Sequence, residues 1–204
     1  SVIQVAGGQL VLAGYSQNAS GGNNYDYSLL RLNANGSVDP AFGSGGVVTV
    51  PIGSGNDEAF RVIRQTDGKL VLTGVSHDPE SLSNHTSVVR LNADGSLDAS
   101  FGDGGKLIVP VSSTDDRAWS VMMQADGKLV MVGYSASAGT GSDFSAVRLN
   151  PDGSLDSSFG TSGKAIIPVS NADDAAWSIV QQPDGKLVVG GYTQSDSTGY
   201  DYSA

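Results

Sequence analysis

The sequence predicts an all-β protein, a β-propeller made of four-stranded blades. Three observations point to this fold class: a residue pattern that returns every 58–60 residues, Asp-Gly turns between short apolar runs, and 28 glycines among 204 residues without a Gly-X-Y period. Glycine at this frequency and without a period indicates many tight turns, and therefore short strands. With 39% hydrophobic residues, a chain of this length can bury the core of one domain.

The repeat is visible when the copies are aligned on their first strand. They begin, at steps of 60, 59 and 58 residues, at Ser1, Arg61, Ser120 and Ser178. We therefore predict one repeat domain over 1–204, with units 1–60, 61–119 and 120–177 and a partial unit 178–204. Units of this length cannot bury their apolar faces alone, so neighbouring copies are expected to stack into a continuous core.

The third copy shows the expected elements in order. A strand, "RAWSVMMQ" from Arg117, leads into the turn "ADGK" and a second strand, "LVMVGYS", that ends at Ser135. An Asp-Gly pair between apolar runs is a strong hairpin signal, because Gly127 adopts a positive φ at no steric cost.

A third strand, "DFSAVRLN", begins at Asp143, and the turn "PDGS" follows it. The segment "LDSSFG" predicts a single helical turn with Asp156 as its cap and Gly160 at its end. A fourth strand, "KAIIPV", starts at Lys164. Four short antiparallel strands per copy suit a propeller blade, which protects its edges by radial repetition. A parallel β-helix is the rival fold, but its coils are shorter and do not carry two Asp-Gly turns.

The copies also resemble a known family. The strings "SIVQQPDGKLVVGGY" and "DFSAVRLNPDGSLDSSFGTSGK" are similar to the bacterial delta-60 repeat, and the resemblance covers the whole chain as three full copies and a partial fourth. It implies a β-propeller of an exported bacterial protein, located outside the cell or on its surface, and it supplies no activity or catalytic residue. The first copy departs from the pattern, with "AGGQL" at Ala6 where the others have Asp-Gly-Lys-Leu.

The chain stops at "DYSA", Asp201 to Ala204, where the other copies continue with Val-Arg-Leu-Asn or a close variant. We therefore expect either a segment of a longer propeller or a ring that a partner chain completes, since two such chains would approach seven blades.

Composition excludes several partners. The chain has 21 acidic and 11 basic residues and a net charge of −10, so phosphates of nucleic acids and anionic membrane surfaces should repel it. No apolar run approaches the ~20 residues that span a bilayer. The absence of cysteine excludes disulfides and thiolate-bound zinc. We expect no nucleic-acid partner, no membrane span and no cofactor.

Calcium is the one metal for which the sequence offers a repeated set of candidate ligands. Acidic segments before the first strands contain Asp57, Asp116 and Asp174, whose carboxylates would form a ring at one mouth of the axial channel and offer oxygen ligands to Ca²⁺. The favoured alternative is that they bond their own backbone and start the strand. A second set, Asn92, Asp94, Ser96 and Asp98 with its counterparts, resembles half a calcium loop but lacks the distal Glu.

One Arg in each third strand and one Asp after it favour a repeated structural ion pair instead: Arg31, Arg90 and Arg148 with Asp39, Asp98 and Asp156. Aromatic residues form two further columns: Phe60, Trp119 and Trp177, and Tyr15, Tyr134 and Tyr192. We expect the first of these columns to be core between blades rather than a sugar-stacking platform. The tyrosine column leaves both alternatives open.

The connection between second and third strands varies most in length and content, so it is the expected binding face. Its candidate residues are Asn23, Tyr25, His77, Asp78, His85, Asp143 and Tyr200. His77, Asp78, Glu80 and His85 would also suit a metal or an acid–base pair, although a solvated polar loop is the commoner reading.

The sequence therefore predicts a non-enzymatic binding or surface-scaffold module, whose loops engage a protein or glycan partner or mediate self-assembly. The alternative is a hydrolase with its site at the axial mouth of the propeller or outside this segment.

Overall fold

The computed structural model describes residues 1–17, 24–137, 141–195 and 199–204. It is an all-β propeller fold in which each repeat forms its own antiparallel sheet. Blade 1 contains β1 (Val2–Gln4), β2 (Leu10–Gln17), β3 (Tyr25–Leu32) and β4 (Val47–Val50), with a short 3-10 turn at Ala6–Gly8. Blade 2 contains β5 (Asp57–Arg64), β6 (Leu70–Asp78), β7 (Ser83–Leu91) and β8 (Lys106–Val109).

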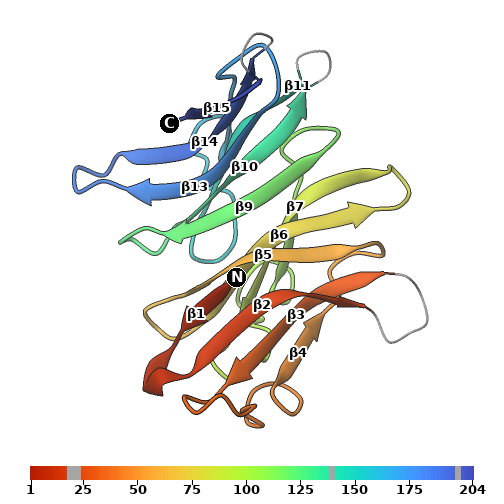
Figure 1. Cartoon of the computed structure of the whole chain (residues 1–204), viewed down its shortest axis with the longest axis vertical. Helices are drawn as coiled ribbons and strands as arrows, with labels where there is room; N and C mark the ends of the chain where they lie inside the picture. The colour runs from red at the N-terminus through yellow and green to blue at the C-terminus, as the bar shows by residue number, and fades with distance from the viewer. Residues whose placement is uncertain (18–23, 138–140, 196–198) are drawn as a thin grey trace.

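Blade 3 contains β9 (Asp116–Met123), β10 (Leu129–Ser137), β11 (Gly141–Leu149) and β12 (Lys164–Ile167). Blade 4 has three strands, β13 (Asp174–Gln181), β14 (Leu187–Ser195) and β15 (Gly199–Ser203). Within each blade, consecutive strands are neighbours in the sheet, and the four sheets follow one another from red to blue in Figure 1. The blade pattern predicted from the repeat is confirmed, as three full blades and a partial fourth.

The hydrophobic core lies between blades. Tyr27 and Leu29 of blade 1 share one cluster with Val62 of blade 2, and each later pair of blades encloses a similar cluster. The first strand of each later blade therefore buries one face against the sheet before it. Stacking, rather than the folding of single repeats, removes the apolar side chains from water.

Glycines shape the hairpin between the first two strands. Gly127 has φ +83° in the Asp-Gly turn, and Asp126 Oδ1 accepts the Lys128 N–H at 3.2 Å. Farther along β10, the register with β9 shifts between Val132 and Gly133, which marks a β-bulge. A Cβ at Gly133 would lie 1.7 Å from the carbonyl oxygen of Arg117, so only glycine fits this bulge.

Two details differ from the expectation. The segment from Asp156 to Gly160 is a hydrogen-bonded turn, not a helical turn, although Asp156 Oδ1 still accepts the Ser158 N–H at 3.1 Å as a cap would. The first strands of blades 2 to 4 also start earlier than the aligned pattern indicated, because the acidic residue before each of them already pairs with the second strand. No helix in the described ranges is long and apolar enough to cross a membrane.

Candidate functional site

The repeated arginines and aspartates form the expected structural ion pairs. Arg Nε lies 2.7–2.8 Å from Asp Oδ2 in each full blade, and the guanidinium also covers a phenylalanine ring at 4.5–4.7 Å from its centroid. The pairs are Arg31–Asp39 over Phe42, Arg90–Asp98 over Phe101, and Arg148–Asp156 over Phe159. These charged side chains therefore pair with each other inside the fold.

The same pairs collect further donors. Lys69 Nζ lies 3.0 Å from Asp98 Oδ2, and Arg31 Nη1 donates to the Ala93 carbonyl of the next blade at 2.6 Å. Burial by itself would raise the pKa of Asp98, but hydrogen bonds from Ser100 and Lys69 outweigh it and hold that pKa well below its usual value. In the first copy Gln9, which stands in the lysine column, donates to Asp39 Oδ2 at 2.7 Å. The first copy departs from the sequence pattern, but the side chain in its lysine column still contacts the repeated aspartate.

The oxygens of the calcium-loop pattern are occupied locally. Asp94 Oδ1 accepts both the N–H and the hydroxyl of Ser96, at 2.9 and 2.7 Å, and Asn92 Nδ2 donates to the same hydroxyl oxygen. Asp152 repeats these bonds with Ser154. This is the side-chain-to-backbone turn that Asx residues form.

Asp57, Asp116 and Asp174 are fully buried, and each carboxylate turns toward the loop that leads into its own strand. Asp116 Oδ2 accepts the Val111 N–H at 2.8 Å, and Oδ1 accepts the Ser112 N–H at 2.9 Å. Asp57 and Asp174 make equivalent bonds. These contacts match the backbone-bonding alternative, and nowhere in the described residues do three His, Cys, Asp or Glu side chains converge as metal ligands.

Three of the candidates expected in the loop between second and third strands meet at one cavity, but the structure places them within β6 and β7, because these strands extend to Asp78 and from Ser83. His77, Asp78 and His85 line a cavity of about 290 Å³ together with Gly53, Ser54, Ser76 and Ile108. His77 Nδ1 lies 3.2 Å from Asn84 Oδ1, and His85 Nδ1 lies 3.6 Å from Oδ2 of Asp116 in blade 3. Glu80 does not line this cavity. Both histidines belong to one blade, so the site has no counterpart in the other repeats.

The remaining candidates do not line this cavity. Tyr25 is partly exposed at the start of β3 and packs its ring edge-on against Tyr15 of the same blade at 5.3 Å. Asp143 is buried. Tyr200 is exposed on blade 4, and Asn23 lies outside the described residues. The Tyr25 N–H donates to Asn56 Oδ1 at 3.0 Å, and the Asn56 carbonyl accepts the His77 N–H at 2.8 Å, so the Tyr25 backbone lies near the blade 2 cavity.

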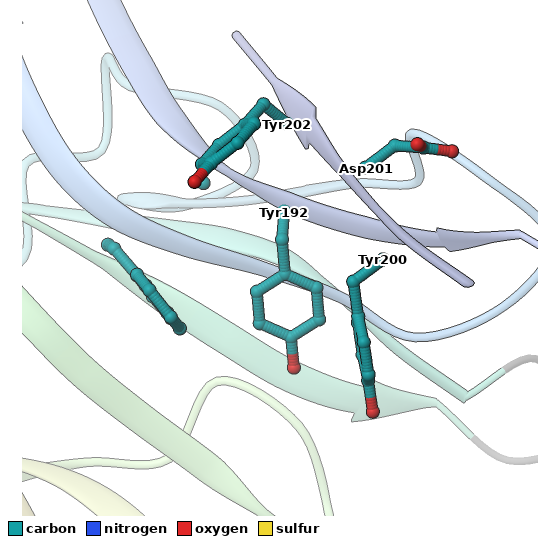
Figure 2. A pocket seen from close by; sticks show the side chains of 6 residues that line it. Tyr192, Tyr200, Asp201 and Tyr202 are labelled. Atoms are coloured by element: carbon teal, nitrogen blue, oxygen red, sulfur yellow. The ribbon is translucent and has the colours of Figure 1, made fainter. Parts of the chain in front are cut away.

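A second candidate surface lies on blade 4, where Trp177 and Tyr192 of the two aromatic columns meet the candidate Tyr200. Blade 4 carries a hollow of about 460 Å³ lined by Trp177, Gly191, Tyr192, Tyr200, Asp201 and Tyr202. Figure 2 shows Tyr192 and Tyr200 side by side, with ring centroids 5.1 Å apart, while Asp201 points away from them. Tyr202 could have been found only by comparing its column with the other blades.

Two members of the tryptophan column lie at a blade interface, where they are half-buried and lie outside the buried core clusters. Phe60 of blade 2 and Trp119 of blade 3 stack across the blade interface, with ring centroids 4.9 Å apart and planes 16° apart. Trp177, in the last blade of this sequence, is 60% exposed on the face of blade 4 turned away from blade 3. The repeat gives each copy the same side chain, but burial depends on whether another blade covers it.

Comparison with known proteins agrees with this architecture. A family model described as "Domain of unknown function (DUF5122) beta-propeller" matches residues 8–42, 65–101, 124–159 and 182–203, more than half of the chain. The chain belongs to the DUF5122 β-propeller family. For this DUF5122 chain the propeller-type repeat expected from the sequence is thus confirmed, whereas the delta-60 name is not specifically supported.

Solved structures resemble the DUF5122 chain in fold only. An endo-arabinase from Bacteroides thetaiotaomicron superposes with a TM-score of 0.52 at 14% identity, over 99% of this chain and 72% of that one. A hypothetical protein from Leishmania major gives a TM-score of 0.41 at 15% identity, over 93% of this chain and 61% of that one, which is too low for any inference. No curated protein sequence matches the chain.

Proposed function

We propose that this DUF5122 propeller, of the delta-60 repeat type, is a non-enzymatic binding and scaffold module of an exported bacterial protein. It engages a protein or glycan partner through the loop cavity of blade 2. The observation that supports this proposal is a contrast between two sets of polar residues. The repeated Arg, Asp and Lys side chains recur in the same contacts in successive blades, whereas His77, Asp78 and His85 occur in one blade and line a cavity. These three also have near neighbours: Asp78 accepts the Glu80 N–H and the Ser81 hydroxyl, His77 contacts Asn84, and His85 lies near Asp116.

The cavity suits recognition of a small polar group. Its volume of about 290 Å³ is near the lower end of ligand sites, and two imidazoles, a carboxylate and serine hydroxyls offer both donors and acceptors. A single sugar ring or one polar side chain of a partner fits this chemistry. The rigid sheet beneath the loop limits the entropy lost on binding.

The test is a binding screen of the intact chain against bacterial-surface polysaccharides, their oligosaccharide fragments and candidate protein ligands, followed by calorimetry on each hit. His77→Ala and Asp78→Ala should weaken binding by about tenfold or more, because each removes a contact in the cavity. Gln194→Ala is the matched control, since Gln194 occupies the His77 column in blade 4. Ligands that bind the His77→Ala and Asp78→Ala variants as tightly as the wild type would contradict the proposal.

A hydrolase is the second candidate function, and the contact of 3.6 Å between His85 Nδ1 and Asp116 Oδ2 favours it. A buried carboxylate beside an imidazole is the arrangement that orients a catalytic base, and Ser76 lines the same cavity. Turnover of ester, glycoside or phosphate-ester substrates that disappears in both His85→Ala and Ser76→Ala would replace the binding proposal with this one. Absence of turnover across the panel leaves the hydrolase without support.

A further inference from the structure

Two basic side chains differ from all the others in the chain. The eleven lysines and arginines all fall in the described ranges, and most of them contact a carboxylate or a backbone carbonyl. Those with such a partner are Arg31, Lys69, Arg90, Lys106, Arg117, Lys128, Arg148, Lys164 and Lys186. Arg61 and Arg64, both exposed on β5, make no hydrogen bond or ion pair with any described residue. These two charges therefore have no contacting counter-charge, in a chain where acidic residues outnumber basic ones.

Both arginines line one groove at the axis of the propeller. The groove has a volume of about 440 Å³ and is lined by the first strands of blades 2, 3 and 4, which are β5, β9 and β13. Strand β9 contacts both β5 and β13, and the three strands follow one another in Figure 1. Blade 2, which carries the arginines, has a blade on each side. The exposure of Arg61 and Arg64 is therefore independent of the outer faces of blades 1 and 4.

The two guanidinium groups approach the groove from opposite faces of β5. Val62 lies in the core between blades 1 and 2, whereas Ile63 packs against the core between blades 2 and 3. Because successive side chains of a strand alternate between faces, Arg61 shares the face of Ile63 and Arg64 shares that of Val62. Strand β5 forms the edge of its sheet. The arginines therefore flank this strand edge, where an anion can contact both of them.

The other groups of the groove suit a small polar molecule. Ser120 and Ser178 contribute hydroxyl groups, and Ile63 and Met122 contribute apolar surface. A guanidinium presents its N–H donors in a planar fork that matches the oxygens of a carboxylate or a phosphate. The volume lies within the range of roughly 300–1,000 Å³ that is usual for small-molecule sites.

We propose that this axial groove binds a small organic anion of about the size of a sugar acid or a sugar phosphate. Arg61 and Arg64 contact its carboxylate or phosphate group, while the serine hydroxyls and the apolar side chains contact the rest of the molecule. The net charge of −10 favours a small ligand, because it repels a polyanion along its whole length, whereas a single anionic group at the groove lies closest to the two arginines. None of the residues that line the groove lines the blade 2 cavity, so the inference does not rest on the proposed function.

The experiment is calorimetric titration of the intact chain with glucuronate, glucose 6-phosphate and neutral glucose, each to about 10 mM, which nearly saturates a site with a dissociation constant near 1 mM. At least one of the two anions should bind, and glucose should bind at least tenfold more weakly. Tighter binding of glucuronate would assign a carboxylate ligand, and tighter binding of glucose 6-phosphate a phosphate ligand. Arg61→Gln and Arg64→Gln should each weaken binding by about tenfold or more and should melt as the wild type does, because neither side chain has a partner to lose.

Lys186→Gln is the matched control. It removes one positive charge from a side chain that is 78% exposed and does not line the groove, so it should bind the anion as the wild type does. Equal losses in Lys186→Gln and the two arginine variants would mean that net charge alone governs binding, and would overturn the proposal. No binding of either anion, or equal binding of glucose, would overturn it as well.

Nuclear magnetic resonance locates the bound anion. The side-chain Nε–H signals of Arg61 and Arg64 should move when the anion is added, whereas those of Arg90 and Arg148, whose Nε–H groups already contact aspartates, should stay in place. Shifts confined to His77, Asp78 and His85 would place the anion in the blade 2 cavity and contradict the axial site. Stronger binding of a heparin oligosaccharide would contradict the assignment of a small ligand.

Discussion

At the scale of single residues, the repeated charged side chains form contacts that hold the fold together. Each repeated aspartate after the third strand is surrounded by donors, and this environment favours its ionised form. For Asp156, hydrogen bonds from Lys128 and then Ser158 lower the pKa below its usual value, as similar contacts do for Asp98. An aspartate whose folded pKa lies below the unfolded value of about 3.9 stabilises the fold above that pH and loses this contribution as the pH falls.

Acid should therefore weaken the propeller through these residues. The urea midpoint of the wild type should fall as the pH drops below about 4, because Asp98 and Asp156 must then take up protons that the folded state disfavours. Asp98→Asn should be less stable at neutral pH and should show a shallower decline in acid. Asp103→Asn, an exposed position on the same blade, is the control. Parallel pH curves for Asp98→Asn and the wild type would contradict this prediction.

Tyr27 and Tyr202, which pair with equivalent positions of the second strand in blades 1 and 4, offer a matched pair of substitutions. Tyr27→Phe removes a buried hydroxyl that bonds to Ser87, and a lost buried hydrogen bond costs about 1 kcal/mol. Tyr202→Phe changes a fully exposed hydroxyl, so the dilute chain should unfold at the wild-type denaturant concentration. Equal effects from the two substitutions in chemical denaturation would show that burial in the blade interface is not what distinguishes them.

At the scale of the element, the hairpin depends on a bulge that only glycine accommodates. In blades 2, 3 and 4 the register between first and second strands shifts next to the recurring glycine, and the carbonyl of the first strand occupies the place of a Cβ. In blade 1 no residue of β1 pairs with Gly14, and among the described residues no atom lies within 4 Å of a Cβ built on it. The recurring glycine is therefore sterically required in blades 2, 3 and 4, whereas no close contact requires it in blade 1.

This contrast predicts unequal costs for the same substitution. Gly133→Ala places its Cβ against the Arg117 carbonyl and forces the backbone to move, which should cost about 2 kcal/mol or more. Gly14→Ala should cost far less or nothing, because its Cβ has no close neighbour among the described residues. Unfolding free energies from denaturant titration decide the matter, and a cost for Gly14→Ala as large as for Gly133→Ala would contradict the bulge argument.

At the scale of the whole molecule, stability comes from contacts between neighbouring blades. Strand β6 of blade 2 is buried along most of its length, with blade 1 on one face and blade 3 on the other. The first and last sheets have one covered face each, as the outer positions in Figure 1 show. In such arrays the interface terms dominate, so the inner blades should open least often.

Hydrogen exchange should report this gradient. Amides of β6 and β10 should exchange most slowly, and those of β1 and β13 to β15 fastest, when the dilute chain is followed by mass spectrometry of its peptides. Uniform protection in the dilute chain would mean that each blade is stable by itself, against the stacking argument.

The amino-acid sequence by itself determined the period, the four-stranded blade, the Asp-Gly turns and the pairing of Arg90 with Asp98, because turn chemistry and strand alternation act over short distances along the chain. It also singled out His77, Asp78 and His85 as candidate binding residues, although it placed them in a loop and the structure places them in β6 and β7. Only the tertiary structure decided which of these converge on a cavity, and which equivalent side chains are buried. Tyr27 and Tyr202 share a column, yet one lies between blades and the other faces solvent, because burial depends on what stacks against a face and no local pattern encodes it.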